Sequence, residues 1–225
     1  MKIKLATRQS ELALFQANYV MNKIQAHHSD VEVELVPMTS DGDQTDKPLH
    51  EIGGKGLFVT KLELALENGE ADIAVHSLKD VPAKIDMKYS IAAIFEREDP
   101  SDVLLSRNGS SLTDFSSNAS IGTSSPRRKA QILRARTDLN IIPVRGNIAT
   151  RIRKLHEGHF DGLIVAKAAL NRLNIELTNA YEFSMQEMLP AASQGFIGVE
   201  CLKSNKKIIS IMNSINNPSE MALAN

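Results

Sequence analysis

The sequence predicts an α/β fold made of two lobes. Short apolar runs alternate with amphipathic stretches along all 225 residues, a pattern typical of largely parallel strands covered by helices on both faces. Charged or Pro-containing residues interrupt this pattern at 96–101 and again at 188–194, before a last apolar run at 196–201. Two such crossings indicate that the middle of the chain is an inserted domain, and a cleft at the boundary of the lobes is the expected ligand site.

Each apolar run has the length of a strand. The expected strands lie at 2–6, 31–37, 72–75, 90–95, 102–105, 119–122, 140–144, 162–166 and 196–201. The expected helices fall between them, including one at 57–68. In the first helix, Leu12, Phe15 and Tyr19 share one face, and Ser10 precedes it as a capping residue.

These elements divide the chain into two expected domains, the first of them discontinuous. Domain 1 is expected to combine residues 1–96 with 195–217, and domain 2 to span 100–190. Residues 218–225 have the pattern of a helix start, although a helix that short has little stability of its own. We expect them to begin a third domain that is missing from this sequence.

Positive charge is concentrated in residues 121–154. This segment holds nine of the 26 lysines and arginines and a single acid, Asp138, although the whole chain has a formal net charge of −1. Seven of the nine are arginines, whose planar fork suits bidentate binding of carboxylates and phosphates. Residues 123–128 have hydroxyl groups and Pro126 at a predicted helix start, where free backbone N–H groups also attract anions. The predicted ligand is a small polyanion.

Composition argues against other classes of protein. No aromatic residue is interleaved with these arginines, which disfavours nucleic acid as a partner. No apolar run approaches the roughly 18 residues that span a bilayer, so no membrane partner is expected. The single cysteine, Cys201, excludes an internal disulfide, and the six scattered histidines predict no metal site.

Two further loops carry candidate chemistry. Residues 76–82 follow an apolar strand, so we expect them at the carboxyl end of a sheet, where ligands of such folds bind. Asp80, between Lys79 and Val-Pro, is not expected in a helix, and an Asx-turn is the alternative to a functional role. Residues 53–58 are rich in glycine but lack the spacing of a nucleotide-binding loop, and we expect a lid there that includes Lys55.

Seven motifs, in order and spacing, resemble those of the porphobilinogen deaminase family. They are residues 6–10 (ATRQS), 53–58 (GGKGLF), 74–82 (AVHSLKDVP), 96–100 (EREDP), 122–128 (GTSSPRR), 145–147 (RGN) and 194–195 (QG). The resemblance covers essentially the whole chain. It implies two lobes like those of periplasmic binding proteins, a third α+β domain that is absent here, and a transferase that condenses four porphobilinogen molecules into hydroxymethylbilane with release of ammonia, in haem and porphyrin biosynthesis.

The resemblance also implies a role for each matching residue. Asp80 would be the catalytic acid, which helps the amino group leave and stabilises positive charge on the reacting pyrroles. The residues that would bind substrate and cofactor carboxylates are Arg8, Ser10, Lys79, Thr123, Ser125, Arg127, Arg128, Arg145, Arg151 and Arg172. Gln194 would lie in the hinge, and Lys55 in the lid. A cytoplasmic monomer is expected.

Two departures from the family pattern concern a charge and a cofactor. Glu51 stands where the family often has a basic residue. The family's dipyrromethane cofactor is attached to a cysteine in the third domain. Cys201 is not expected to replace that cysteine, because it lies in the strand-like run 196–201, where a buried and unreactive thiol is typical.

Two other functions stay open: a two-lobed protein that binds a small anion without catalysis, and a nucleic-acid-binding protein. Asp80 favours the enzyme, because a carboxylate among arginines would repel an anion that is only bound.

Overall fold

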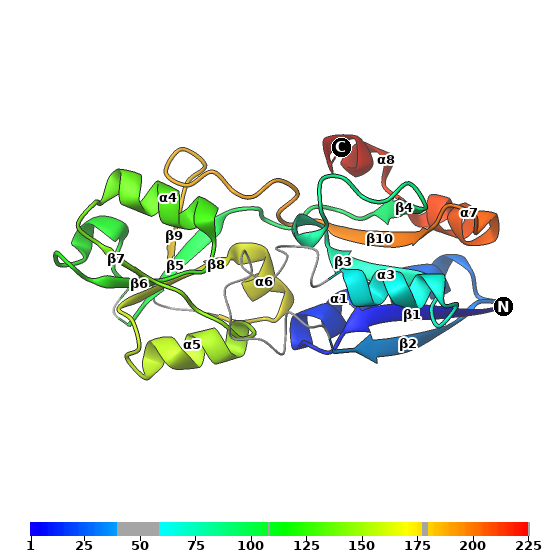
Figure 1. Cartoon of the computed structure of the whole chain (residues 1–225), viewed down its shortest axis with the longest axis horizontal. Helices are drawn as coiled ribbons and strands as arrows, with labels where there is room; N and C mark the ends of the chain where they lie inside the picture. Colours follow the sequence, from blue (N-terminus) through cyan, green and yellow to red (C-terminus); the bar gives the residue numbers. More distant parts are fainter. Residues whose placement is uncertain (40–58, 108, 177–179, 225) are drawn as a thin grey trace. The chain divides into compact units, whose positions relative to one another are not determined.

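The structure is a computed structural model that describes residues 1–39, 59–107, 109–176 and 180–224. The chain divides into two units (Figure 1). Unit 1 combines Met1–Glu98 with Gly195–Asn225, and unit 2 is Asp99–Gln194. Both divisions fall at the polar interruptions of the sequence pattern. The expected lid with Lys55, and Glu51, lie outside the described residues.

Unit 1 is built on a five-stranded mixed sheet in the order β2-β1-β3-β10-β4. Its strands are β1 (Lys2–Arg8), β2 (Glu32–Met38), β3 (Ile73–Ser77), β4 (Tyr89–Ile94) and β10 (Ile197–Leu202). β1 is parallel to β2 and β3, whereas β10 is antiparallel to β3 and β4. The carboxyl ends of β1 and β3 and the amino end of β10 therefore lie at one edge, which we call the unit 1 edge.

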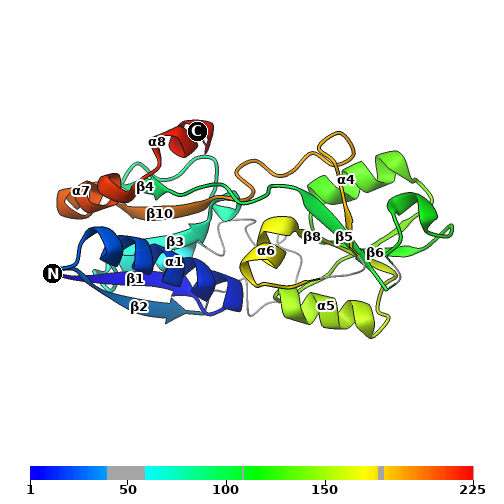
Figure 2. The same cartoon turned by 180° about the vertical axis from the view of Figure 1, so that it is seen from behind.

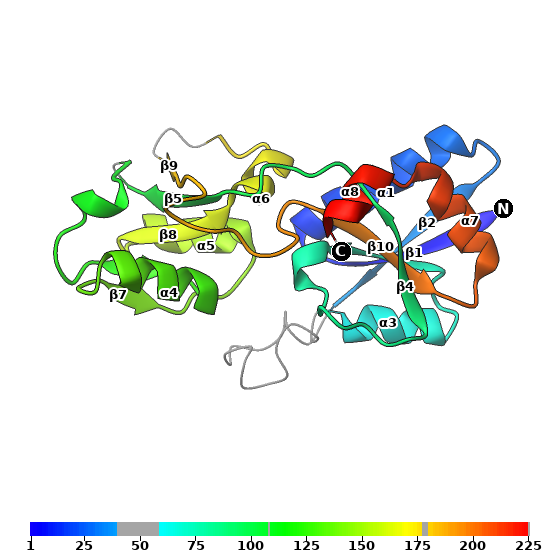
Figure 3. The same ribbon diagram turned by 90° about the horizontal axis from the view of Figure 1, so that it is seen from above.

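Helices cover both faces of this sheet. On one face lie α1 (Glu11–His27) and α7 (Lys206–Ile215), whose buried apolar side chains pack on β1, β3 and β10. On the other lies α3 (Thr60–Glu67), which packs on Ala6, Ala74 and Tyr89. Figure 3 shows the sheet between these two layers. Ser10 caps α1 as predicted, since its Oγ accepts the N–H of Ala13 at 3.4 Å.

Unit 2 repeats the same design. Its sheet has the order β7-β6-β8-β5-β9, with strands β5 (Asp102–Ser106), β6 (Ser120–Gly122), β7 (Asn140–Ile142), β8 (Gly162–Ala166) and β9 (Ala180–Glu182). β6 is parallel to β7 and β8, whereas β5 is antiparallel to β8 and β9. The carboxyl ends of β6, β7 and β8 and the amino end of β5 form the unit 2 edge.

The helices of unit 2 also lie on opposite faces of its sheet. On one face lies α4 (Pro126–Ala135), whose Ile132 packs with Leu104, Ile121 and Ile164. The other face carries α5 (Ile148–His156) and α6 (Lys167–Arg172). Figure 2 shows α6 directly after β8. Ser125 caps α4 and Pro126 occupies its first position, as predicted.

The α/β assignment is confirmed, and so is the expectation of largely parallel strands. Among the described strands, four of the five in each sheet run in one direction, and one runs against them: β10 in unit 1 and β5 in unit 2. In unit 1 the reversed strand is β10, because β4 leads out of the unit and β10 leads back at the same edge, and the sequence pattern did not predict this reversal. The sequence pattern also missed β9, which has only three residues.

The C-terminal helix α8 (Pro218–Ala224) belongs to unit 1. Its Met221 and Ala224 pack against a small cluster that contains Ile94 and Phe196. The expectation that residues 218–225 begin a third domain stays a prediction.

Candidate active site

Asp80 lies at the unit 1 edge, directly after β3. Residues Leu78–Asp80 form one turn of 3-10 helix, closed by a bond from the N–H of Val81 to the carbonyl of Leu78 at 3.1 Å. The expectation that Asp80 is not helical was therefore wrong, since a single i to i+3 turn fits before Pro82. Asp80 is half-buried, and in the described part of the chain its carboxylate makes no ion pair.

Three other predicted residues share this edge. Arg8 ends β1 and Ser10 caps the helix that follows, while Lys79 precedes Asp80 in the turn after β3. Because β1 and β3 are parallel neighbours, their carboxyl ends bring these residues to the same side of unit 1. All three are half-buried or partly exposed, so the edge offers donors for an anion beside one carboxylate.

Gln16 supports this edge and was missed in the sequence. It lies on the buried face of α1, and its amide exchanges two hydrogen bonds with the Ser77 hydroxyl, at 2.9 and 3.1 Å. These bonds fix the end of β3 just before the turn that carries Asp80. A signal was present, because a glutamine among the apolar residues of a core-facing stripe needs a buried partner.

A buried polar pair lies deeper in the same sheet. Nε2 of His76 on β3 and Oε2 of Glu200 on β10 are 3.0 Å apart, and both residues are buried. The second oxygen of Glu200 has no hydrogen-bond partner among the described residues. Burial, and then the charge of Glu200, raise the pKa of the nearby Glu63 above its ordinary value.

The unit 2 edge collects the predicted residues of the basic segment. Thr123 and the start of α4 follow β6, Arg145 follows β7, and Arg172 lies on α6 after β8. The Ser124 hydroxyl joins two of these loops, since it donates to the Val144 carbonyl at 2.7 Å and accepts the Val144 N–H at 2.9 Å.

The remaining members of this group take part in local hydrogen bonds. The Ser125 N–H donates to Thr123 Oγ1 at 3.2 Å, and Arg151 Nε donates to the Gly146 carbonyl at 2.7 Å. Thr123 and Arg172 are buried. The parallel order of β7, β6 and β8 thus brings together residues that are far apart in the sequence.

Asp102 organises the arginines of this edge. It is fully buried at the amino end of β5, beside Ala166 of β8. Its Oδ2 accepts from Arg127 Nη2 at 2.6 Å, and its Oδ1 accepts from Arg128 Nη2 at 2.7 Å and Nε at 3.2 Å. Gln194 Nε2 donates to the same Oδ1 at 2.9 Å. Sequence reasoning placed Asp102 only at the start of a strand.

These contacts differ from the role that was expected for Arg127 and Arg128. Both were expected to bind ligand carboxylates, and in this structure both bind a carboxylate of the protein itself. Binding of substrate carboxylates by either stays a prediction. Gln194, expected in the hinge, is buried and also donates to the Pro100 carbonyl at 2.6 Å.

Cys201 is fully buried in β10, as expected. Burial, and then the charge of Glu200, raise the pKa of its thiol to about 11. The thiol is therefore protonated near neutral pH, and the thiolate is the reactive form. A covalent adduct on this sulfur would have to displace the core around it, so Cys201 does not fit a cofactor attachment site.

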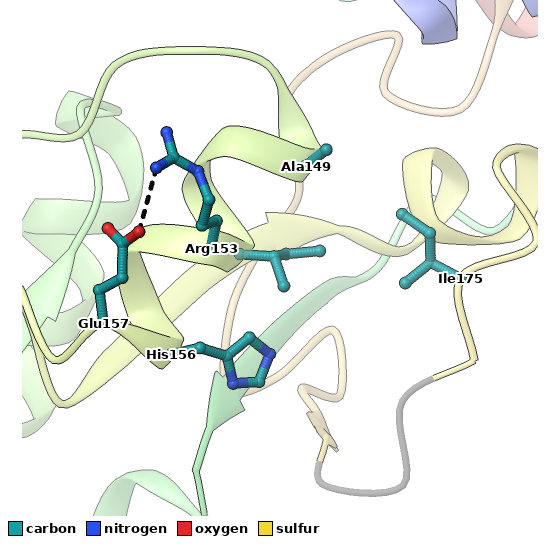
Figure 4. Close-up of a pocket in the computed structure, with 6 residues that line it drawn as sticks. Ala149, Arg153, His156, Glu157 and Ile175 are labelled. Atoms are coloured by element: carbon teal, nitrogen blue, oxygen red, sulfur yellow. Dashed lines mark hydrogen bonds and ion pairs between the residues drawn. The ribbon is translucent and has the colours of Figure 1, made fainter.

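A surface hollow of about 520 Å³ lies elsewhere on unit 2 (Figure 4). It is lined by Ala149, Ile152, Arg153, His156, Glu157 and Ile175. Figure 4 shows Arg153 paired with Glu157, at 3.0 Å, on the helix α5. The hollow includes none of the predicted site residues, and its walls are mainly apolar.

The described residues contain neither a candidate metal centre nor a helix that could cross a membrane. No group of three His, Cys, Asp or Glu side chains in these ranges is arranged to hold a metal ion. Among the helices described, none combines the length and apolar character that crossing a membrane requires.

Known proteins similar to this chain decide its family. The model of the porphobilinogen deaminase dipyrromethane cofactor binding domain matches residues 3–210. This chain belongs to the porphobilinogen deaminase family. The porphobilinogen deaminase of Lawsonia intracellularis (strain PHE/MN1-00) is 46% identical over 216 residues, which are 96% of this chain and 70% of that protein. The porphobilinogen deaminase of Ruthia magnifica subsp. Calyptogena magnifica is 46% identical over 211 residues, 93% of this chain and 69% of that protein.

Solved structures similar to this member of the deaminase family show its fold. An ancestral arginine-binding protein bound to arginine has a TM-score of 0.55 at 13% identity, over 98% of this chain and 92% of that one. A probable amino-acid ABC transporter extracellular-binding protein from Bacillus subtilis has a TM-score of 0.57 at 12% identity, over 96% and 90%. The predicted likeness to periplasmic binding proteins is confirmed for the fold.

Proposed function

We propose that this protein is a hydroxymethylbilane synthase, a transferase of tetrapyrrole biosynthesis that condenses four porphobilinogen molecules into the linear tetrapyrrole hydroxymethylbilane and releases ammonia. The observation that carries the proposal is the family match over residues 3–210, which includes every site residue predicted from the sequence. Porphobilinogen carries an acetate and a propionate, so a growing chain accumulates carboxylates. The arginine-rich unit 2 edge suits such a ligand.

Asp80 is the proposed catalytic residue. As ammonia leaves, positive charge develops on the substrate, and a nearby carboxylate stabilises that charge and helps move the proton. Its place at the carboxyl end of β3, with Arg8 and Lys79 at the same edge, supports this role. A protein that only binds anions would gain nothing from a carboxylate there.

The donors at each edge, taken separately, suit carboxylates of the kind that a dipyrromethane carries. They are guanidinium, ammonium and hydroxyl groups, and one of them, Nε of Arg127, is buried without a hydrogen-bond partner among the described residues. When bound, dipyrromethane supplies the pyrrole end to which the first substrate is joined. Within this chain we assign it carboxylate-binding residues and no attachment point, because Cys201 is buried in the core.

We also propose that the enzyme is a cytoplasmic monomer with a small molecule as its only partner. The absence of aromatic residues among the arginines of 121–154 supports the exclusion of nucleic acid. Light scattering of the purified full-length protein tests the oligomeric state.

Asp80→Asn in the full-length protein tests the function. A general acid or base contributes typically about 10²- to 10⁴-fold, so we expect the rate of porphobilinogen consumption to fall by at least about 100-fold with the fold retained. Asp86→Asn is the matched control, because Asp86 is an exposed aspartate of the same unit. An Asp80→Asn protein that keeps more than about half of the wild-type rate would contradict the assignment of Asp80 as the catalytic residue.

A further inference from the structure

The side-chain carboxylate of Asp102 accepts four hydrogen bonds, none of which belongs to the backbone pairing of the sheet. Three of them come from two guanidinium groups and one from the Gln194 amide. Burial by itself would raise the pKa of Asp102, but the charges of Arg128 and then Arg127, with the bond from Gln194, hold it below its ordinary value. The carboxylate is therefore ionised at neutral pH in a place that water does not reach.

The cluster is not neutral. Two guanidinium groups share one carboxylate, so one positive charge is left at the unit 2 edge. A buried or half-buried charge of this kind is favourable only with a partner, and an incoming carboxylate is such a partner. The cluster of Asp102, Arg127 and Arg128 therefore has one positive charge that its own carboxylate does not balance.

The two arginines differ in what they have left to offer. Arg128 binds Asp102 through Nε and Nη2 and the Ile164 carbonyl through Nη1, and its side chain is only 9% exposed. Arg127 binds Asp102 through Nη2 and the Leu189 carbonyl through Nη1, and its side chain is 24% exposed. Arg128 therefore anchors Asp102 to the sheet, and Arg127 is the member that reaches solvent.

We propose that Asp102 is a positioning residue, which holds the Arg127 guanidinium in the orientation that receives a substrate carboxylate. The inference rests on the proposed function and adds a residue to it. Asp102 acts through Arg127 and does not touch the substrate. Gln194 extends the same network to the segment that leads back to unit 1, through its bonds to Asp102 and to the Pro100 carbonyl.

The test is Asp102→Asn in the full-length protein, alone and combined with Arg127→Lys. Loss of one charge-assisted bond changes affinity by about tenfold or more, so we expect the KM for porphobilinogen to rise by at least about tenfold while kcat changes less. Arg127→Lys should raise KM by a similar factor in the wild-type background. In the Asp102→Asn background, Arg127→Lys should raise KM by less than about threefold, because the Arg127 guanidinium is then already displaced from its binding orientation.

Asp161→Asn is the matched control. Asp161 is another hydrogen-bonded aspartate of unit 2, but it precedes β8 and accepts from Ser120 at the opposite edge of the sheet. We expect it to affect thermal unfolding without a change in KM. Intact mass is measured for each variant, and a folded Asp102→Asn protein that has lost a dipyrrole adduct supports the inference, because that cofactor carries the same kind of carboxylates.

A folded Asp102→Asn protein with wild-type KM, kcat and cofactor content would overturn the inference. So would a double variant whose increase in KM equals the product of the increases in the two single variants, because the two residues would then act independently. If Asp102→Asn does not fold, Asp102→Glu is tested in its place, because it keeps the charge and moves the carboxylate by one methylene. A wild-type KM for Asp102→Glu would also contradict the inference. If the wild-type protein itself does not convert porphobilinogen, the proposed function is wrong. If the wild type is active and the Asp102 variants match it, only the inference about Asp102 is wrong.

Discussion

The neighbours of each arginine decide what it can do. Arg136 uses its guanidinium on Asp138 and on the carbonyls of Leu112 and Phe115, which closes the end of α4. Arg153 forms an exposed ion pair with Glu157. Counting the bases of residues 121–154 therefore overstates the charge available to a ligand, and each arginine has to be considered in its own contacts.

Arg145 provides a direct test of carboxylate binding at this scale. It is half-buried after β7, at the unit 2 edge. Arg145→Lys keeps the charge and removes the planar fork, so we expect the KM for porphobilinogen to rise by about tenfold. Arg153→Lys, on the exposed face of α5 with 65% of its side chain accessible, should change KM by less than about twofold. Equal KM values for the wild type and Arg145→Lys would show that bidentate recognition is wrong there.

At the scale of the element, β3 and β10 are joined by more than their backbone bonds. His76 lies opposite Gly198 in the register, and its ring reaches the carboxylate of Glu200 farther along β10. A side chain at Gly198 would meet Leu78 at 2.8 Å, so the glycine leaves room for the turn that carries Asp80. The two strands thus hold a polar pair and a close contact beneath the unit 1 edge.

His76→Ala should destabilise the protein strongly. It leaves the buried carboxylate of Glu200 without its partner, which typically costs about 3–5 kcal/mol in the free energy of unfolding. His159→Ala is the matched control, because His159 also pairs with a glutamate but is exposed, and surface pairs contribute about 0–1 kcal/mol. Urea unfolding measures both. Similar losses in the two variants would contradict a stabilising role for the buried pair.

At the scale of the whole chain, the two crossings between the units run beside each other. The Glu98 N–H donates to the Gly195 carbonyl at 3.1 Å, and the Phe95 N–H donates to the Ile197 carbonyl at 3.3 Å. Gly195 has a φ of +97°, and a Cβ there would lie 2.2 Å from the Glu98 carbonyl oxygen. Glycine is therefore required by the backbone conformation and by the close approach of the other crossing.

Gly195→Ala tests this requirement against Gly69→Ala. Both glycines have positive φ, but a Cβ at Gly69 would meet nothing within 4 Å. We expect the loss of unfolding free energy for Gly69→Ala to stay near the backbone cost of about 1 kcal/mol and the loss for Gly195→Ala to exceed it by about 1–3 kcal/mol. Thermal unfolding of the two variants checks the difference, and equal melting temperatures would mean that the crossings separate readily.

The sequence by itself determined the features that depend on consecutive residues. Apolar periodicity located most strands, Ser10 and Ser125 marked two helix starts, and the polar interruptions marked the crossings. The motifs, taken in order, identified the family that the match over residues 3–210 confirms. Each of these signals is local, so it can be recognised without knowing how the chain folds back on itself.

The tertiary structure alone decided strand order and side-chain partners. Asp102 and Arg128 are 26 residues apart in the sequence, Gln16 and Ser77 are 61 apart, and His76 and Glu200 are 124 apart. Nothing in a linear pattern tells which of many carboxylates a given arginine will meet. That choice is made when the sheets order their strands, because burial then forces each polar group to find a partner within hydrogen-bond distance.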